Sequence, residues 1–172
     1  AVLKNKLYVM GGCVANGKNA TPAVYTDLVE VLDLDTLTWS RGPSLPSARY
    51  SCAAQTLPSD GILVVGGFYF STSGASFRYY KEALHFDGTS FTSAGKLHEG
   101  RSNLALVPTS KGMYALGGSA DLPAYANVVF YDYKTSAWTN STPMLEARGW
   151  LAGAAATVDG KEYVYAMAGM SL

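Results

Sequence analysis

One pattern recurs along this chain and constrains its fold more than any other: an apolar run that ends in a pair of glycines. Complete pairs end at Gly12, Gly67 and Gly118, and a degenerate copy ends at Gly169. Successive copies therefore lie 55, 51 and 51 positions apart. A regular period of this length indicates a repeat architecture, in which each unit buries its apolar surface by stacking against the next.

Two further residue types recur in the same order within the units. An aromatic residue follows a turn that contains Asp, and an Arg lies ten positions beyond that aromatic residue. The aromatic residues are Trp39, Phe91 and Trp138, and the arginines are Arg49, Arg101 and Arg148. Three anchors in a fixed order across three copies are a strong indication of repeated structure.

Each unit also holds four short runs rich in Val, Leu, Tyr and Ala, bounded by residues that favour turns, which is the pattern of strands. The second unit predicts strands at about 50–57, 62–67, 81–87 and 91–94, and the third at about 102–108, 112–118, 126–133 and 136–140. No segment keeps a 3.6-residue periodicity, so we expect essentially no helix. We expect long loops between the second and third strands, at 13–26, 68–80 and 119–125.

These anchors resemble the kelch repeat, in which a strand ending in Gly-Gly precedes Tyr-Asp-x-x-Thr-x-x-Trp and an Arg opens the next blade. Residues 131–138 match that second element closely, residues 32–39 lack only its Tyr, and residues 86–91 are two positions short with Phe for Trp. The resemblance implies an all-β, kelch-type β-propeller arc of about three and a half four-stranded antiparallel blades. We expect one partial propeller over 1–172, with blades at approximately 1–45, 46–97, 98–145 and 146–172.

Propellers close with roughly four to eight blades. We therefore expect the chain to be part of a larger ring, closed by remaining blades or by another chain. The first blade is expected to keep only a remnant of its innermost strand, and the last to hold two strands. Apolar faces would then be bare at both ends, so we expect residues 1–172 alone not to form a stable monomer.

Charge and motif content narrow the classes of function. The charges of thirteen basic and thirteen acidic side chains cancel, so the chain has no excess of positive charge for binding nucleic acid. No apolar run reaches the ~18 residues of a membrane span. His85 and His98 fall at different positions of the repeat, and no metal-ligand spacing occurs, so we predict no metal, cofactor or catalytic residue. Copper radical oxidases of the galactose oxidase kind also use kelch-like blades, but their Tyr and His ligand set has no counterpart here.

The expected loops carry the binding hypothesis. Residues 68–80 mix Tyr, Phe and Arg with Ser and Gly, as binding surfaces do. The candidate binding residues of the loops are Tyr69, Phe70, Phe77, Arg78, Tyr79 and Tyr125. Alternatively, half of these aromatic side chains pack the loops onto the blade edges.

The repeated arginines have two possible roles. In kelch proteins that bind acidic peptides the Arg at this place lines a mouth of the channel, which implies that Arg49, Arg101 and Arg148 bind carboxylates. Alternatively, they satisfy carbonyl groups or an acidic side chain between blades. We predict a scaffold that binds a protein or glycan partner through loops on one face. The alternative is a carbohydrate-active enzyme, of the sugar oxidase or isomerase type, with a pocket at the channel mouth.

Two glycosylation triplets favour a secreted location slightly over a cytoplasmic one. They begin at Asn19 and Asn140, and both are expected in loops. Cys13 and Cys52 are expected to be small buried thiols in strands, although an even number of cysteines also permits a disulfide.

Overall fold

The computed structural model describes residues 1–14, 24–71, 76–121 and 123–171. Within these ranges every helix or strand element is a strand. No helix in the described part of the chain is long and apolar enough to cross a membrane. The prediction of an all-β fold is confirmed.

The strands form three four-stranded antiparallel sheets and one two-stranded sheet, apart from short hairpins described below. We term these sheets blades 1 to 4. Blade 1 contains β1 (Val2–Leu3), β2 (Lys6–Met10), β5 (Val29–Asp33) and β6 (Trp39–Arg41). Blade 2 contains β7 (Ala53–Leu57), β8 (Gly61–Val65), β11 (Glu82–Phe86) and β12 (Phe91–Lys96). Blade 3 contains β13 (Ala105–Pro108), β14 (Gly112–Leu116), β15 (Val128–Asp132) and β16 (Ala137–Ser141), and blade 4 contains β17 (Ala152–Val158) and β18 (Lys161–Met167).

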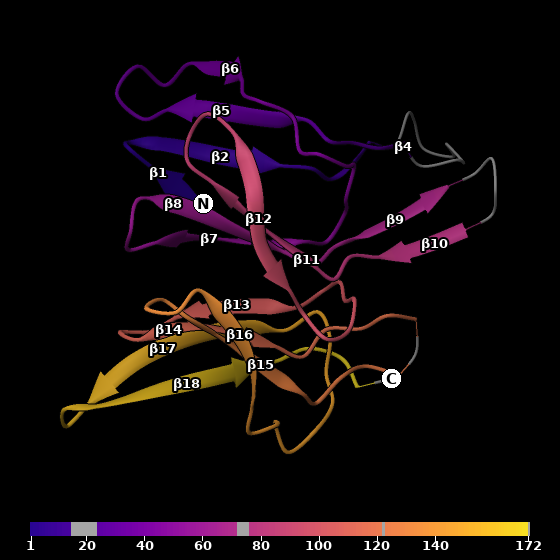
Figure 1. The fold of residues 1–172 in the computed structure, drawn as a ribbon, viewed down its shortest axis with the longest axis vertical. Helices are drawn as coiled ribbons and strands as arrows, with labels where there is room; N and C mark the ends of the chain where they lie inside the picture. The colour runs from indigo at the N-terminus through magenta and orange to yellow at the C-terminus, as the bar shows by residue number, and fades with distance from the viewer. Residues whose placement is uncertain (15–23, 72–75, 122, 172) are drawn as a thin grey trace.

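Each blade follows chain order from one edge to the other, so consecutive strands pair as antiparallel neighbours. Figure 1 shows the blades stacked in sequence order, from blade 1 in indigo and violet to blade 4 in yellow. Blade 1 has a paired two-residue innermost strand, β1, which was expected only as a remnant.

The core lies between blades, because successive side chains of a strand point to opposite faces of its sheet. In β8, Ile62 and Val64 pack in a cluster with blade 1, whereas Leu63 and Val65 pack in a cluster with blade 3. A third cluster joins blades 3 and 4, around Val107. Both faces of an inner blade are thus apolar, which explains the unbroken run of apolar residues in β8.

Two segments that were expected to be loops contain hairpins. β3 (Cys13–Val14) pairs with β4 (Val24–Tyr25), and β9 (Phe68–Ser71) pairs with β10 (Ser76–Tyr79). The described residues of the third segment form only isolated bridges, of which one joins Ser119 and Ala124. Aromatic residues favour strands, and the run Phe68-Tyr69-Phe70 accordingly forms one instead of an irregular loop.

Candidate functional site

The hairpins β3–β4 and β9–β10 both leave the sheets at the ends of second strands. Both extend to the same side of the arc in Figure 1. The segment that follows β14 lies beside the β9–β10 hairpin, because the Tyr79 hydroxyl donates to Asp121. We term this side the loop face. It contains the loop residues that the sequence singled out for binding.

One backbone hydrogen bond closes the base of each of these segments. In every case the donor is the backbone amide of the residue at which the chain returns to the blade, and the acceptor is the carbonyl of the second glycine of the Gly-Gly pair. The bonds are Thr26 N to Gly12 O (3.1 Å), Tyr80 N to Gly67 O (2.9 Å) and Tyr125 N to Gly118 O (2.8 Å). These glycines have φ between 92° and 119°, a conformation that residues with a Cβ avoid, so the glycine pair serves to form this base.

The repeated Arg links each base to the next blade. The backbone of Arg49 belongs to blade 1, because its carbonyl accepts from Gly12 N at 2.9 Å. Its side chain belongs to blade 2, because Nη1 donates to Gly66 O at 3.1 Å and the guanidinium lies 4.2 Å from the Tyr80 ring centre. Cation and aromatic face attract at this distance.

Arg101 repeats this arrangement between blades 2 and 3. Its Nη1 donates to Gly117 O at 3.0 Å and Asn127 O at 3.4 Å, and its guanidinium lies 5.0 Å from the Tyr125 ring centre. Burial lowers the pKa of both Arg49 and Arg101. These two side chains therefore show the second role considered from the sequence, which is to satisfy carbonyl groups between blades.

Arg148 makes the equivalent contact less completely. Its Nη1 donates to Ala168 O at 3.2 Å and Nη2 lies 3.6 Å from Glu146. The side chain of Arg148 is 30% exposed, whereas that of Arg101 is 0% exposed. Arg148 is thus the member of the set that solvent reaches.

Seven aromatic rings form a cluster over the β9–β10 hairpin, with Phe68 at its centre. Ring centres lie 5.3 Å from Phe68 for Tyr79, 5.5 Å for Tyr25, 5.9 Å for Phe77 and 6.4 Å for Tyr50. Tyr69 joins through Tyr25, and Phe70 stacks on Phe77 at 4.6 Å. Part of this aromatic surface packs the hairpin onto its neighbours, as the alternative from the sequence proposed, but Tyr50 and Phe77 stay exposed.

A hollow of about 370 Å³ lies beside this cluster, and we term it the loop-face hollow. Four aromatic and four small polar side chains line it. The aromatic residues are Tyr50, Phe68, Tyr79 and Trp150, and the polar residues are Ser102, Asn103, Ser119 and Asp121. Its lining comes from blades 2, 3 and 4 together with the segments that leave them.

Backbone geometry positions this lining. Ser51, Asn103 and Trp150 occupy equivalent positions ahead of the innermost strands, and all three have φ between 53° and 57°. A ladder of hydrogen bonds joins them, from Asn103 N to Ser51 O (3.0 Å) and from Trp150 N to Asn103 O (2.9 Å). A left-handed conformation is unfavourable for a bulky residue such as Trp. Nevertheless Trp150 keeps it with its side chain 52% exposed.

One carboxylate in the loop-face hollow has a fixed partner. The Tyr79 hydroxyl donates to Asp121 Oδ1 at 3.0 Å, so Tyr79 and Asp121 link the hairpin to blade 3. Desolvation raises the pKa of Tyr79 and that of Tyr125. Both phenols therefore stay neutral hydrogen-bond donors at physiological pH.

Arg78 lies on the other side of the hairpin. It shares a hollow of about 400 Å³ with Tyr69 and Tyr80, and its guanidinium lies 4.9 Å from the Tyr80 ring centre. Glu82 is 3.5 Å away, but both partners are well exposed. Tyr80 thus contacts two guanidinium groups, one buried and one open to solvent.

The structure brings Tyr79 into the loop-face hollow but leaves the repeated arginines, Phe77 and Arg78 out of its lining. Tyr50, Asn103, Asp121 and Trp150 were missed from the sequence. Tyr50 directly follows a repeated Arg, and Asn103 and Trp150 each lie two positions after one, so the spacing from the Arg was the available signal.

The expected thiols and histidines need separate mention. Cys13 and Cys52 are both free, and Cys13 is exposed in β3, which contradicts the expected burial. Cys52 lies ahead of β7 and is partly buried, and burial raises the pKa of its thiol. His85 and His98 line different hollows, and among the described residues no group of three or more His, Cys, Asp or Glu could hold a metal ion.

Stacked four-stranded antiparallel blades with Gly-Gly bases and a repeated inter-blade Arg define an arc of a β-propeller. Residues 1–46 match the Kelch motif. This match and the blade architecture together support a kelch-repeat family for the chain.

Among the 157 solved chains that match is one described as "Structure of YjhT". The two are 16% identical and superpose with a TM-score of 0.74, over 90% of this chain and 54% of that one. The chain thus spans about half the length of that protein, and the likeness concerns the fold. No curated protein matches the chain in sequence.

Proposed function

We propose that this kelch arc is a binding module that holds a protein or glycan partner on its loop face. The observation that carries the proposal is the loop-face hollow, where four aromatic side chains meet four small polar ones. Ligand sites combine apolar walls with a few polar groups that orient the ligand. Its volume of about 370 Å³ lies at the small end of the range for ligand sites.

Exposure of the aromatic side chains supports this proposal. Tyr50, Phe77 and Trp150 are exposed, and all three lie on or beside the aromatic cluster. A contiguous apolar surface in contact with water commonly marks a binding site. Aromatic residues are also enriched in the energetically dominant part of interfaces.

The left-handed conformation of Trp150 gives further support. Unfavourable backbone conformations cost about 1–3 kcal/mol and cluster at ligand sites. Here the hydrogen-bond ladder from Ser51 through Asn103 holds Trp150 in that conformation. The indole is therefore positioned before a partner arrives, which lowers the entropic cost of binding.

Paired variants test this proposal. Trp150→Ala removes one wall of the hollow, whereas Trp39→Ala removes an equally exposed indole from β6, at the outer edge of blade 1. Binding to a glycan array and to a displayed peptide library is measured for both variants, and the affinity of each hit by calorimetry. We expect Trp150→Ala to weaken binding at least tenfold and Trp39→Ala to leave it unchanged. Equal affinities of the two variants, or the absence of any hit, would overturn the proposal.

The carbohydrate-active enzyme remains the alternative function. In that case its pocket is the same hollow, in which Asp121 is the lining carboxylate and Tyr79 its hydrogen-bond partner. General acid–base chemistry requires a titratable group within reach of the reacting bond. Incubation of the intact chain with each glycan hit separates the alternatives, because a binding module returns the glycan unchanged and an enzyme does not.

A further inference from the structure

A second hollow lies on the outer rim between blades 2 and 3, and we term it the rim hollow. Its volume is about 380 Å³. Trp138, Thr139 and Asn140 of β16 line one side, and Lys96, Leu97 and His98 at the end of β12 line another. The proposed partner site on the loop face uses none of these residues.

The triplet Asn140-Ser141-Thr142 borders this hollow. Asn140 was expected in a loop but lies near the end of β16, where its side chain is exposed. β16 is the edge strand of blade 3, and within the described part of the chain no strand pairs with its outer side. The Asn140 amide makes no side-chain hydrogen bond with the described residues, so it is free to react.

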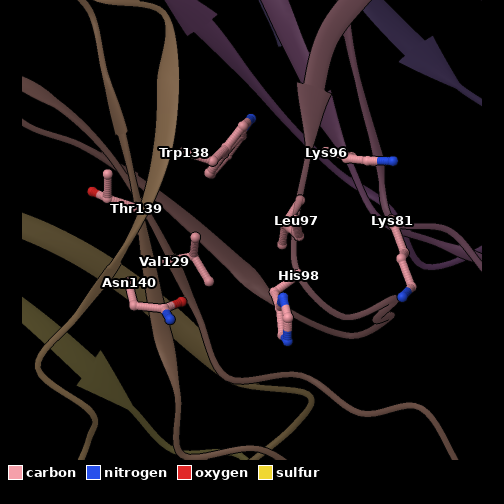
Figure 2. Close-up of a pocket in the computed structure, with 8 residues that line it drawn as sticks. All are labelled: Lys81, Lys96, Leu97, His98, Val129, Trp138, Thr139 and Asn140. Atoms are coloured by element: carbon pink, nitrogen blue, oxygen red, sulfur yellow. The ribbon is translucent and has the colours of Figure 1, made fainter.

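Trp138 and Asn140 lie on one face of β16, because they are two positions apart in a strand. Figure 2 shows both side chains on the same side of the ribbon, toward Leu97 and His98. Their cross-strand neighbours, Tyr131 and Val129, belong to the core between blades 2 and 3. A group attached to Asn140 therefore begins in the hollow between these blades.

The Trp138 ring is held in place. Its Nε1 donates to Ala94 O at 2.9 Å, and its ring centre lies 4.9 Å from that of Tyr131. The side chain is only partly buried and the rest faces the rim hollow. A fixed indole with one accessible surface is a platform for a flat ligand with an apolar face.

We propose that Asn140 is an N-glycosylation site and that its first sugar packs in the rim hollow against Trp138. In the transfer, Asn140 Nδ2 forms a bond to the anomeric carbon of an N-acetylglucosamine carried on a lipid-linked diphosphate. The bond from that carbon to the diphosphate oxygen breaks, the lipid diphosphate leaves, and the amide loses one proton. This transfer takes place in a secretory compartment, so the proposal also places the chain outside the cytosol.

Covalent attachment makes the sugar–indole contact intramolecular. A tethered group has a high effective concentration beside its site, so even a weak contact is populated. The C–H groups on one face of the sugar contact the indole, while Asn140 and His98 place polar atoms beside its hydroxyl groups. The glycan also covers the unpaired edge of β16, an edge at which strands of other molecules could pair.

Site occupancy is the first part of the test. The full chain is secreted from animal cells, and its peptides are mapped by mass spectrometry. We expect a glycan on Asn140 in the parent chain and in Thr142→Ser, which keeps the hydroxyl group that the triplet requires, and none in Thr142→Ala. An unmodified Asn140 in the parent chain would overturn the proposal. The loop-face proposal would stand in that case, because it uses none of these residues.

The position of the sugar is the second part. A triple variant, Thr139→Asn with Asn140→Gln and Ser141→Thr, moves the triplet by one residue and so attaches the glycan to the opposite face of β16 while Trp138 is retained. In the parent we expect ring-current shifts of the first sugar's proton resonances and a lower Tm after enzymatic removal of the glycan. The triple variant should show neither. Sugar resonances at free-glycan positions and an unchanged Tm in the parent would overturn the assignment of the sugar to the hollow.

Discussion

β8 and β18 are the second strands of blades 2 and 4, and both are rich in apolar residues, yet their surroundings differ. Leu63 in β8 is 0% exposed, whereas Met167 in β18 is 44% exposed. β8 has blade 1 on one face and blade 3 on the other, but β18 packs only against blade 3 within the described residues, through Val164 and Ala166. The comparison shows that a kelch blade does not bury its own faces, and that burial comes from its neighbours.

The repeated arginines show the same difference. Arg101 is enclosed by blades on both sides and reaches two carbonyl groups, whereas Arg148 bonds one carbonyl and is partly exposed. We therefore expect the repeated Arg to contribute more to the free energy of unfolding at position 101 than at position 148.

The largest expected difference concerns core truncation in the two strands. Leu63→Ala should lower the free energy of unfolding by about 2–5 kcal/mol, because it leaves a cavity in the core between blades 2 and 3. Met167→Ala should lower it by less than about 1 kcal/mol, as surface substitutions do. Urea unfolding of both variants measures the two values, and similar losses would show that blade 4 is covered by a surface that we have not identified.

The next difference concerns the arginines. Arg101→Ala should cost about 3 kcal/mol, because it leaves the buried carbonyl group of Gly117 without its Arg donor and opens a cavity. Arg148→Ala should cost less than about 1 kcal/mol, since solvent can replace its contact with Ala168. Thermal melting of the two variants side by side tests this pair, and a larger loss for Arg148→Ala would refute the inter-blade role that we assign.

A smaller effect is expected on association. Tyr163, Tyr165 and Met167 alternate along β18 and form an exposed apolar row. Chain 1–172 alone should therefore associate as its concentration rises, and Tyr163→Ser with Tyr165→Ser should reduce the association. Light scattering across a dilution series reports it, with Phe77→Ser, which alters an exposed ring on the hairpin, as the control. A parent chain that remains monomeric and melts sharply would show that the exposed row is harmless.

The smallest effect concerns the pH dependence of stability, and it arises from the Asp-containing turn between the third and fourth strands of a complete blade. Asp87 Oδ1 accepts hydrogen bonds from Thr89 N (2.7 Å) and Ser90 N (2.8 Å), and with the bond from the Thr89 hydroxyl these hold the pKa of Asp87 well below its usual value. A lowered folded-state pKa contributes stability that is complete above the unfolded value of about 4 and is lost as the pH falls below it. Asp87→Asn keeps an acceptor but does not titrate, so its urea midpoint should fall less between about pH 5 and pH 3 than the parent midpoint does. Parallel slopes would contradict this account.

Much of the fold could be predicted from the sequence, because glycine pairs, turn residues and apolar runs act locally. β8 was predicted at 62–67 and lies at Gly61–Val65. The β9–β10 hairpin was missed, since its aromatic residues are as typical of binding loops as of strands.

The candidate site was predicted only in part. Tyr50, Asn103 and Trp150 come from three separate repeats and meet in one hollow. The left-handed backbone at Ser51, Asn103 and Trp150 helps to position them, and a Trp in the sequence does not indicate such a conformation as a glycine would. The arginines could be located by their spacing, but only the fold shows which carbonyl groups they reach. Asn140 was found by its triplet, and its place in β16 came from strand pairing. Asn19, the other predicted glycosylation residue, lies outside the described residues.

The bond from Tyr80 N to Gly67 O joins the two feet of the β9–β10 hairpin. Because this hydrogen bond holds the two ends of the hairpin together, a change in the length or sequence of the residues between them need not disturb the blades. The same fastening recurs at Gly12 and Gly118, so over evolutionary time each blade can acquire a new extension independently of the others. In protein engineering, the hydrogen-bonded bases at Gly12, Gly67 and Gly118 are therefore equivalent positions at which a binding loop can be inserted.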